Sequence, residues 1–134
     1  MDDKKLIELA LAARENAYVP YSKFKVGAVV LTKDGQIFKG CNIESASFTP
    51  TICAERTALS KAVSEGHRNI DTIVVVGSLD RISFPCGVCR QFIREFGRDI
   101  RIISATSTDN YKVFTIEDLL PNSFGPEDLE HDNI

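Results

Sequence analysis

Two short stretches of this sequence place residues of metal and proton chemistry close together. TICAER contains Cys53 and Glu55, and FPCGVC ends in a Cys-x-x-Cys pair, Cys86 and Cys89. Both stretches stand where an apolar helix is predicted to begin, and the partial positive charge at a helix start stabilises thiolates. Three thiolates on two neighbouring helix starts favour zinc, which takes tetrahedral sulfur sites.

The number of zinc ligands decides between a structural and a catalytic site. A structural site is closed by a fourth protein ligand, for which the candidates are Cys41, His67 and His131. Cys41 is interpreted as a small core residue within a strand, and both histidines as solvated. We therefore expect an open site with three ligands. A redox role for the Cys-x-x-Cys pair is the weaker alternative, because the chain lacks a thioredoxin-like arrangement.

An open zinc site leaves room for a water molecule and lowers its pKa. Catalysis then needs a proton acceptor that does not itself bind the metal, and Glu55 stands in the first helical turn beside Cys53. Alone, such a carboxylate would be an ordinary partner of the helix macrodipole. Beside three cysteines it predicts a proton carrier. A zinc-stabilised binding module, closed by Cys41, is the non-catalytic alternative.

The composition indicates a single cytoplasmic domain spanning residues 1–134. Hydrophobic residues make up 43% of the chain and charged residues 26%, and the net charge is −3. This charge gives no electrostatic footprint for a nucleic acid polymer. No apolar run approaches the roughly 20 residues of a membrane span, and the acidic start is unlike a signal peptide. In a reducing compartment the four cysteines are interpreted as ligands, catalysts or core residues rather than as disulfides.

Hydrophobic periodicity predicts alternating helices and strands that can hold these residues. The predicted helices cover residues 3–17, 51–65 and 86–96, with a short fourth beginning at Thr115. The predicted strands cover residues 25–32, 36–43, 71–78, 99–106 and 110–115. The first two strands form a hairpin around Asp34-Gly35. This order predicts an α/β fold, a three-layer α/β/α sandwich with a five-stranded mixed sheet. Residues 121–134 form a polar, acidic tail.

The two cysteine motifs resemble a known zinc-deaminase pattern, in which a ligand, a non-ligating glutamate and P-C-x-x-C follow one another. The further stretches YSKFKVGAVV, GCNIESASF and LLPNSFGPEDL are similar, in order, to those of the small free-nucleoside cytidine deaminases. The resemblance covers nearly the whole chain. It implies hydrolytic deamination of free cytidine and 2′-deoxycytidine in pyrimidine salvage, one Zn²⁺ per subunit, and a homotetramer with sites at subunit interfaces.

The resemblance also implies roles for single residues. Cys53, Cys86 and Cys89 match the zinc ligands, and Glu55 matches the proton shuttle. The other matched residues bind the nucleoside: Asn42 and Glu44 a ribose hydroxyl, Phe24 the base and sugar, the backbone of Ala54 and Cys86 the base, and Phe124 a neighbouring subunit's site. Without the resemblance, Asn42 and Glu44 would be interpreted as closing a strand into a loop, and the two phenylalanines as core or interface residues.

One residue departs from the family pattern: Phe48 stands where many relatives carry tyrosine. The ligand set also raises a question of charge, because three thiolates bring more negative charge than zinc neutralises. We expect Arg56, and also Arg90, to donate hydrogen bonds to the sulfurs and offset that charge.

Two other deaminase functions are alternatives to deamination of free cytidine. One is a polynucleotide deaminase, which would need a basic and aromatic surface. The other is a deaminase of a modified cytosine nucleoside such as an antibiotic.

Overall fold

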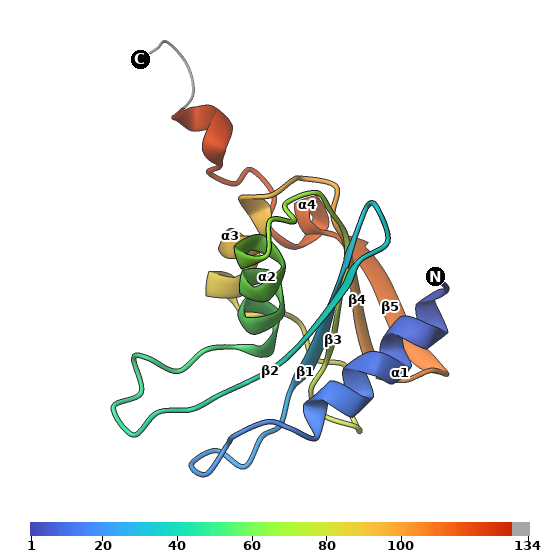
Figure 1. Ribbon diagram of the computed structural model, residues 1–134, viewed down its shortest axis with the longest axis vertical. Helices are drawn as coiled ribbons and strands as arrows, with labels where there is room; N and C mark the ends of the chain where they lie inside the picture. Colours follow the sequence, from blue (N-terminus) through green and yellow to red (C-terminus); the bar gives the residue numbers. More distant parts are fainter. Residues whose placement is uncertain (130–134) are drawn as a thin grey trace.

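A mixed β-sheet forms the centre of the computed structural model, which describes residues 1–129 (Figure 1). Its strands are β1 (Gly27–Thr32), β2 (Ile37–Cys41), β3 (Ile70–Val76), β4 (Arg101–Ser107) and β5 (Asn110–Thr115). Their order across the sheet is β2-β1-β3-β4-β5. β3 and β4 run parallel, and the other neighbouring pairs run antiparallel. The parallel pair needs a crossover connection, which α3 supplies.

Helices lie on both faces of this sheet. They are α1 (Asp3–Arg14), α2 (Ala54–Ser64), α3 (Gly87–Arg94) and the short α4 (Ile116–Leu119), followed by a 3₁₀ turn at Pro126–Asp128. α1 covers one face, whereas α2 and α3 pack side by side over the other (Figure 1). The predicted α/β fold, a three-layer sandwich around a five-stranded mixed sheet, is therefore confirmed.

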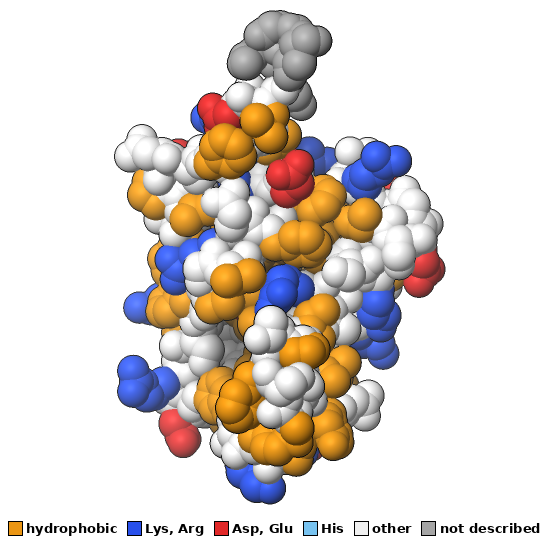
Figure 2. Space-filling model, turned by 90° about the vertical axis from the view of Figure 1, so that its left-hand side faces the viewer, with side chains coloured by type: hydrophobic (Ala, Val, Ile, Leu, Met, Phe, Trp, Pro, Cys, Tyr) orange, Lys and Arg blue, Asp and Glu red, His pale blue; other side chains and the backbone are white. Residues whose placement is uncertain are grey.

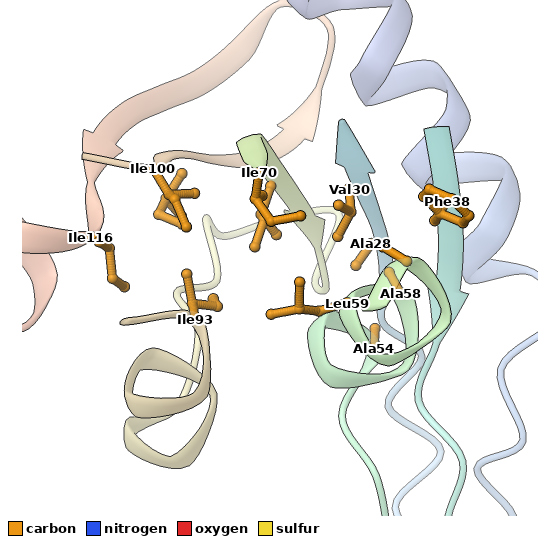
Figure 3. Packing of buried hydrophobic residues seen from close by; sticks show 13 residues of the cluster. Ala28, Val30, Phe38, Ala54, Ala58, Leu59, Ile70, Ile93, Ile100 and Ile116 are labelled. Carbon is orange, nitrogen blue, oxygen red and sulfur yellow. The ribbon is translucent and has the colours of Figure 1, made fainter. Parts of the chain in front are cut away.

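Alternation of side chains along the strands divides the core in two, because successive strand residues point to opposite faces. Ala28 and Val30 of β1 pack toward α2 and α3, and Val29 between them packs toward α1. Figure 3 shows Ala54, Ala58 and Leu59 of α2 pointing toward the first of these clusters. The start of α2 is thus held against the sheet by buried apolar contacts, and α3 is anchored to the same cluster by Ile93.

A close approach of backbones fixes α2 more finely. A Cβ atom at Gly40 of β2 would lie 2.5 Å from the backbone nitrogen of Ala58 and 2.7 Å from the carbonyl oxygen of Ala54. Only glycine leaves room for the first turn of α2 to lie this close to the strand. Since Cys53 and Glu55 flank Ala54, the contact helps to set the position of both.

Several element boundaries differ from the sequence-based expectation. The first helix ends at Arg14 rather than at residue 17, because the N–H groups of Glu15, Asn16 and Ala17 bond to carbonyls three residues back and close a turn. The second strand ends at Cys41, because Ile43 leaves the sheet to form bridges elsewhere. The predicted Asp34-Gly35 turn is confirmed by a positive φ of 92° at Gly35.

Within residues 1–129, no helix is both long and apolar enough to cross a membrane.

Candidate active site

The three motif cysteines meet where α2 and α3 begin. Cys53 is the N-cap residue of α2 and Cys86 is the N-cap residue of α3, both with extended backbone. Neither thiol caps its own helix, a task that serine, threonine or aspartate side chains usually perform. Cys89 lies in the first turn of α3, and the three Sγ atoms all lie within 4.8 Å of one another.

The donor set fits a zinc ion. The Sγ atoms of Cys53 and Cys86 lie 3.9 Å apart, and both residues are free cysteines. Tetrahedral zinc with Zn–S bonds of about 2.3 Å would hold two sulfurs roughly 3.8 Å apart. Cys89 is buried, Cys53 is half-buried and Cys86 is exposed, so the cluster has a closed side and an open side.

The candidates for a fourth ligand lie elsewhere or outside the described residues. Cys41 is partly exposed, not part of the core, and lines a cavity of about 330 Å³ between α1, β2 and α2. Burial raises the pKa of its thiol. The His67 ring packs against Phe38, with ring centroids 5.3 Å apart. His131 lies outside the described residues. Within residues 1–129, the group that could hold a metal comprises three cysteines.

The three thiols do not ionise alike. A hydrogen bond from Cys89, followed by one from Arg56, lowers the pKa of the Cys53 thiol to about 5. The pKa of the Cys89 thiol is raised, chiefly because it donates that hydrogen bond and because it is buried. One thiolate therefore forms readily at Cys53. A bound divalent cation favours deprotonation of a coordinating thiol, so metal binding and proton release are coupled here.

Glu55 is a buried carboxyl beside this cluster, with only 4% of its surface exposed. Burial raises its pKa to about 7, and the negative charge of Cys53 acts in the same direction. The helix start, which favours the ionised carboxylate, is outweighed. A carboxyl with a pKa near neutrality can both accept and release a proton, as general acid–base catalysis requires.

Arg56 and Arg90 follow the two cysteine motifs but have different partners. Arg56 donates from Nη2 to Cys53 Sγ across 3.6 Å. Arg90 donates instead to the carbonyl oxygens of Pro85 and Leu119, at 2.7 and 2.8 Å. The prediction of a sulfur contact is confirmed for Arg56. For Arg90 it is wrong, because the carbonyl end of α4 lies within its reach.

The loop that follows β2 is tied by backbone bridges to the segment before β1 and to the residue before Cys53. Ile43 forms a parallel bridge with Tyr18 and an antiparallel bridge with Ile52, the residue before Cys53. These bridges hold Asn42 and Glu44, on either side of Ile43, in a fixed relation to the cysteine cluster. The family resemblance predicted a nucleoside-binding role for both residues, but the sequence did not reveal the bridges that hold them.

Asn42, Glu44 and Phe24 lie together, as predicted. The Asn42 amide donates to the carbonyl of Phe24 at 2.8 Å and accepts from the N–H of Val26 at 2.9 Å. The Glu44 carboxylate accepts from the N–H groups of Tyr21 and Ser22, both at 3.1 Å. Phe24 is 46% exposed. The two loops therefore combine a fixed carboxylate, a fixed amide and an accessible aromatic ring.

Residues 1–105 match the family described as the cytidine and deoxycytidylate deaminase zinc-binding region. The chain belongs to this family. It is therefore a zinc-dependent hydrolytic deaminase, and the cysteine cluster lies within the matched residues.

Individual family members show the same relationship over most of their length. A cytidine deaminase of Halalkalibacterium halodurans is 47% identical over 130 residues, which are 96% of this chain and 98% of that protein. The crystal structure of a cytidine deaminase from Burkholderia pseudomallei matches with a TM-score of 0.88 at 45% identity, covering 92% of this chain and 100% of that one. A more distant relative is the blasticidin-S deaminase of Bacillus cereus, 35% identical over 125 residues, covering 86% of this chain and 89% of that protein.

Phe124 and Glu44, both predicted to bind the nucleoside, line different cavities. It is 58% exposed and lines a cavity of about 540 Å³ on the outer side of α3, together with Arg56, Val88 and Phe92. Glu44 lines a different cavity, of about 450 Å³. Within this chain, Phe124 therefore does not share a cavity with Glu44.

Sequence reasoning missed an ion pair that holds the segment carrying Phe124. Arg94 of α3, only 2% exposed, donates to both carboxylate oxygens of Glu127 at 2.8 Å and to Ser123 Oγ at 2.8 Å. Arg98 donates to the same carboxylate at 3.2 Å. The four-residue spacing of Arg90, Arg94 and Arg98, followed by an acidic tail, was the signal that could have revealed it. Ser22 was also missed.

Proposed function

We propose that this protein hydrolyses cytidine and 2′-deoxycytidine to uridine and 2′-deoxyuridine, with release of ammonia, in the salvage of pyrimidine nucleosides. The observation that carries the proposal is the buried Glu55 carboxyl, which shares a helix start with a cluster of three cysteines suited to zinc. The family relationship supports the same reaction. The 134 residues are proposed to form one deaminase domain.

Cys53, Cys86 and Cys89 would hold one Zn²⁺ per chain. The bound ion would supply the Lewis acidity that makes water nucleophilic near neutral pH. Arg56 would offset part of the excess negative charge, since its guanidinium already contacts Cys53 Sγ. Partners of this kind, outside the ligand set itself, tune the ligands and typically change activity 10- to 100-fold.

Glu55 would move the protons of the reaction. Its carboxylate accepts a proton from the attacking water and delivers it to N3 of the cytosine ring as the new bond to C4 forms. It then takes the proton of the new hydroxyl group on C4 and passes it to the amine at C4, so that the C4 carbonyl forms, the C–N bond breaks and ammonia leaves. A pKa near 7 suits both directions of transfer.

The loops around Asn42 would hold the nucleoside. Asn42 and Glu44 would bind a sugar hydroxyl that ribose and deoxyribose share, and Phe24 would pack against base and sugar. The backbone of Ala54, the first residue of α2, and that of Cys86 would contact the base. This is why both cytidine and 2′-deoxycytidine are proposed as substrates.

A homotetramer is proposed as the functional unit, in the cytoplasm. Phe124 is exposed and lines a different cavity from Glu44, which supports a role in a neighbouring subunit's site. Figure 2 shows several groups of hydrophobic side chains on the face of α2 and α3, where exposed apolar surface favours association. No nucleic acid polymer is proposed as a substrate, because the net charge is −3.

One assay of ammonia release tests this function. The zinc-loaded protein is offered cytidine, 2′-deoxycytidine, cytosine, adenosine, a cytosine-containing oligonucleotide and blasticidin S. We expect turnover of the first two and little of the others. Blasticidin S is included because a relative acts on it. Preferential turnover of the oligonucleotide or of blasticidin S would overturn the proposal.

A further inference from the structure

Ser22 contacts two of the residues that are proposed to bind the nucleoside. Its hydroxyl donates a hydrogen bond to Oε2 of Glu44. The same oxygen accepts a hydrogen bond from the N–H of Phe24 at 3.0 Å. Ser22 thus links the carboxylate of one residue directly to the backbone of the other.

The Glu44 carboxylate is almost fully occupied by this chain. Oε1 accepts the N–H groups of Tyr21 and Ser22, and Oε2 accepts the Ser22 hydroxyl. A carboxylate offers about four acceptor positions, so about one remains. Glu44 and Ser22 both line the cavity of about 450 Å³, so an outside donor can reach this part of the loop.

The group that fills the remaining position must be a hydrogen-bond donor. The Ser22 hydrogen bond lowers the pKa of the Glu44 carboxyl, and an ionised carboxylate only accepts hydrogen bonds. On a nucleoside, the donors at the sugar end are hydroxyl groups.

The backbone around Ser22 is held in an unfavourable conformation. Lys23 has a φ of +61°, in the left-handed region that side-chain-bearing residues rarely adopt. This turn brings the N–H of Phe24 back to the Ser22 hydroxyl, while Asn42 binds the Phe24 carbonyl on the other side. Such conformations persist where surrounding contacts over-determine them.

We propose that Ser22 is a positioning residue, whose hydroxyl aims the Glu44 carboxylate at a sugar hydroxyl and locks Phe24 beside it. This inference rests on the proposed nucleoside deamination. It assigns to Ser22 the selectivity for one sugar hydroxyl and no part in proton transfer.

The first test compares steady-state kinetics of serine variants on cytidine. We expect Ser22→Ala to raise KM about tenfold, the effect of losing one hydrogen bond to a charged group, with kcat, zinc content and Tm close to those of the unsubstituted protein. Ser22→Thr keeps the hydroxyl and should restore KM to within about threefold. The matched control is Ser107→Ala, because Ser107 Oγ also accepts the N–H two residues on, at 3.2 Å. It should leave both constants unchanged.

The second test removes the hydroxyl from the substrate. We compare cytidine with 3′-deoxycytidine and 5′-deoxycytidine. For the analogue that lacks the hydroxyl bound by Glu44, the KM penalty of Ser22→Ala should fall to nearly one, and for the other analogue it should persist. In a Glu44→Ala background, Ser22→Ala should add no more than about twofold on cytidine, since residues acting through one contact are not additive.

Each result supports or overturns the inference. Equal penalties on both analogues, additive effects with Glu44→Ala, or a fall in kcat at unchanged KM would overturn it. Loss of zinc or a large fall in Tm in Ser22→Ala would assign a structural role instead, and would also overturn it. If the unsubstituted zinc protein does not deaminate cytidine, the proposed function fails. If it does and Ser22→Ala behaves normally, only the inference about Ser22 fails.

Discussion

The helices α2 and α3 begin in nearly the same way but have different tasks. Each has a cysteine at its N-cap, in extended backbone and without a side-chain capping bond, and each has an arginine three or four residues later. Arg56 of α2 turns toward the cluster and contacts Cys53 Sγ, whereas Arg90 of α3 turns away to bind two carbonyl oxygens.

The neighbours of the two helices explain this difference. The end of α4 lies beside α3, so Arg90 donates a hydrogen bond to the carbonyl of Leu119 at that end. The C-terminal segment also packs against α3 and brings Glu127 to Arg94. The guanidinium of Arg56 contacts the cysteine cluster through Nη2, and its buried Nε has no hydrogen-bond partner among the described residues. We infer that α2 carries the chemistry and that α3, beyond its two cysteines, holds the C-terminal segment in place.

The largest expected effect concerns the metal site that the starts of α2 and α3 form together. Cys86→Ala should reduce zinc affinity by more than the roughly 10–100-fold that loss of an outer partner costs, and activity and Tm should fall with it. Zinc content after gel filtration and a thermal melt measure this. Cys41→Ser is the control and should keep its zinc, because Cys41 lies in a different cavity. Zinc loss in Cys41→Ser would indicate a closed site.

The next effect should be confined to α2. Glu55→Ala should lower kcat by about 10²–10⁴-fold, the usual worth of a general acid–base residue, while zinc content and nucleoside binding are retained. The control is Glu65→Ala, which removes an exposed carboxylate from the other end of the same helix. Near-normal turnover in Glu55→Ala would contradict the proton-carrier role.

The two arginines test the comparison directly. Arg56→Ala should lower kcat about tenfold with little change in Tm, because it removes a partner of a metal ligand. Arg90→Ala should leave kcat nearly unchanged but cost about 1–3 kcal/mol in the free energy of unfolding, because two carbonyl groups lose a charged donor. Denaturant unfolding and ammonia release separate the outcomes. Similar profiles for both variants would show that the helices do not differ in this way.

The smallest effect concerns the ion pair of α3 and depends on pH. The Arg94 side chain lowers the pKa of the Glu127 carboxyl, so the native state holds this group ionised at lower pH than the unfolded chain does. The stability it contributes is complete above the unfolded pKa of about 4.3 and is lost as pH falls through the lower native pKa. Glu127→Gln should therefore reduce stability at pH 7 and make it depend less on pH below about 4.5, which Tm values across that range measure.

The sequence predicted the cysteine cluster because residue type, spacing and position at helix starts all indicated the same chemistry. It also predicted the sheet, since the continuous apolar runs of β1 and β3 depend on local pattern. Arg90 shows where this reasoning fails: its partners, Pro85 and Leu119, are chosen by how α3 and α4 pack. Ser22 was missed for the same reason, because its contact with Glu44 joins residues 22 positions apart.

The bridge between Ile43 and Ile52 affects which length of substrate fits the site. The backbone pair joins Glu44, at the proposed sugar end, to Cys53, at the metal end, through two hydrogen bonds of 3.0 Å. The main chain therefore fixes the distance between the sugar end and the metal end of the site. Side-chain substitutions in the loop would change how tightly a ligand is held, and the length of ligand that fits would stay the same.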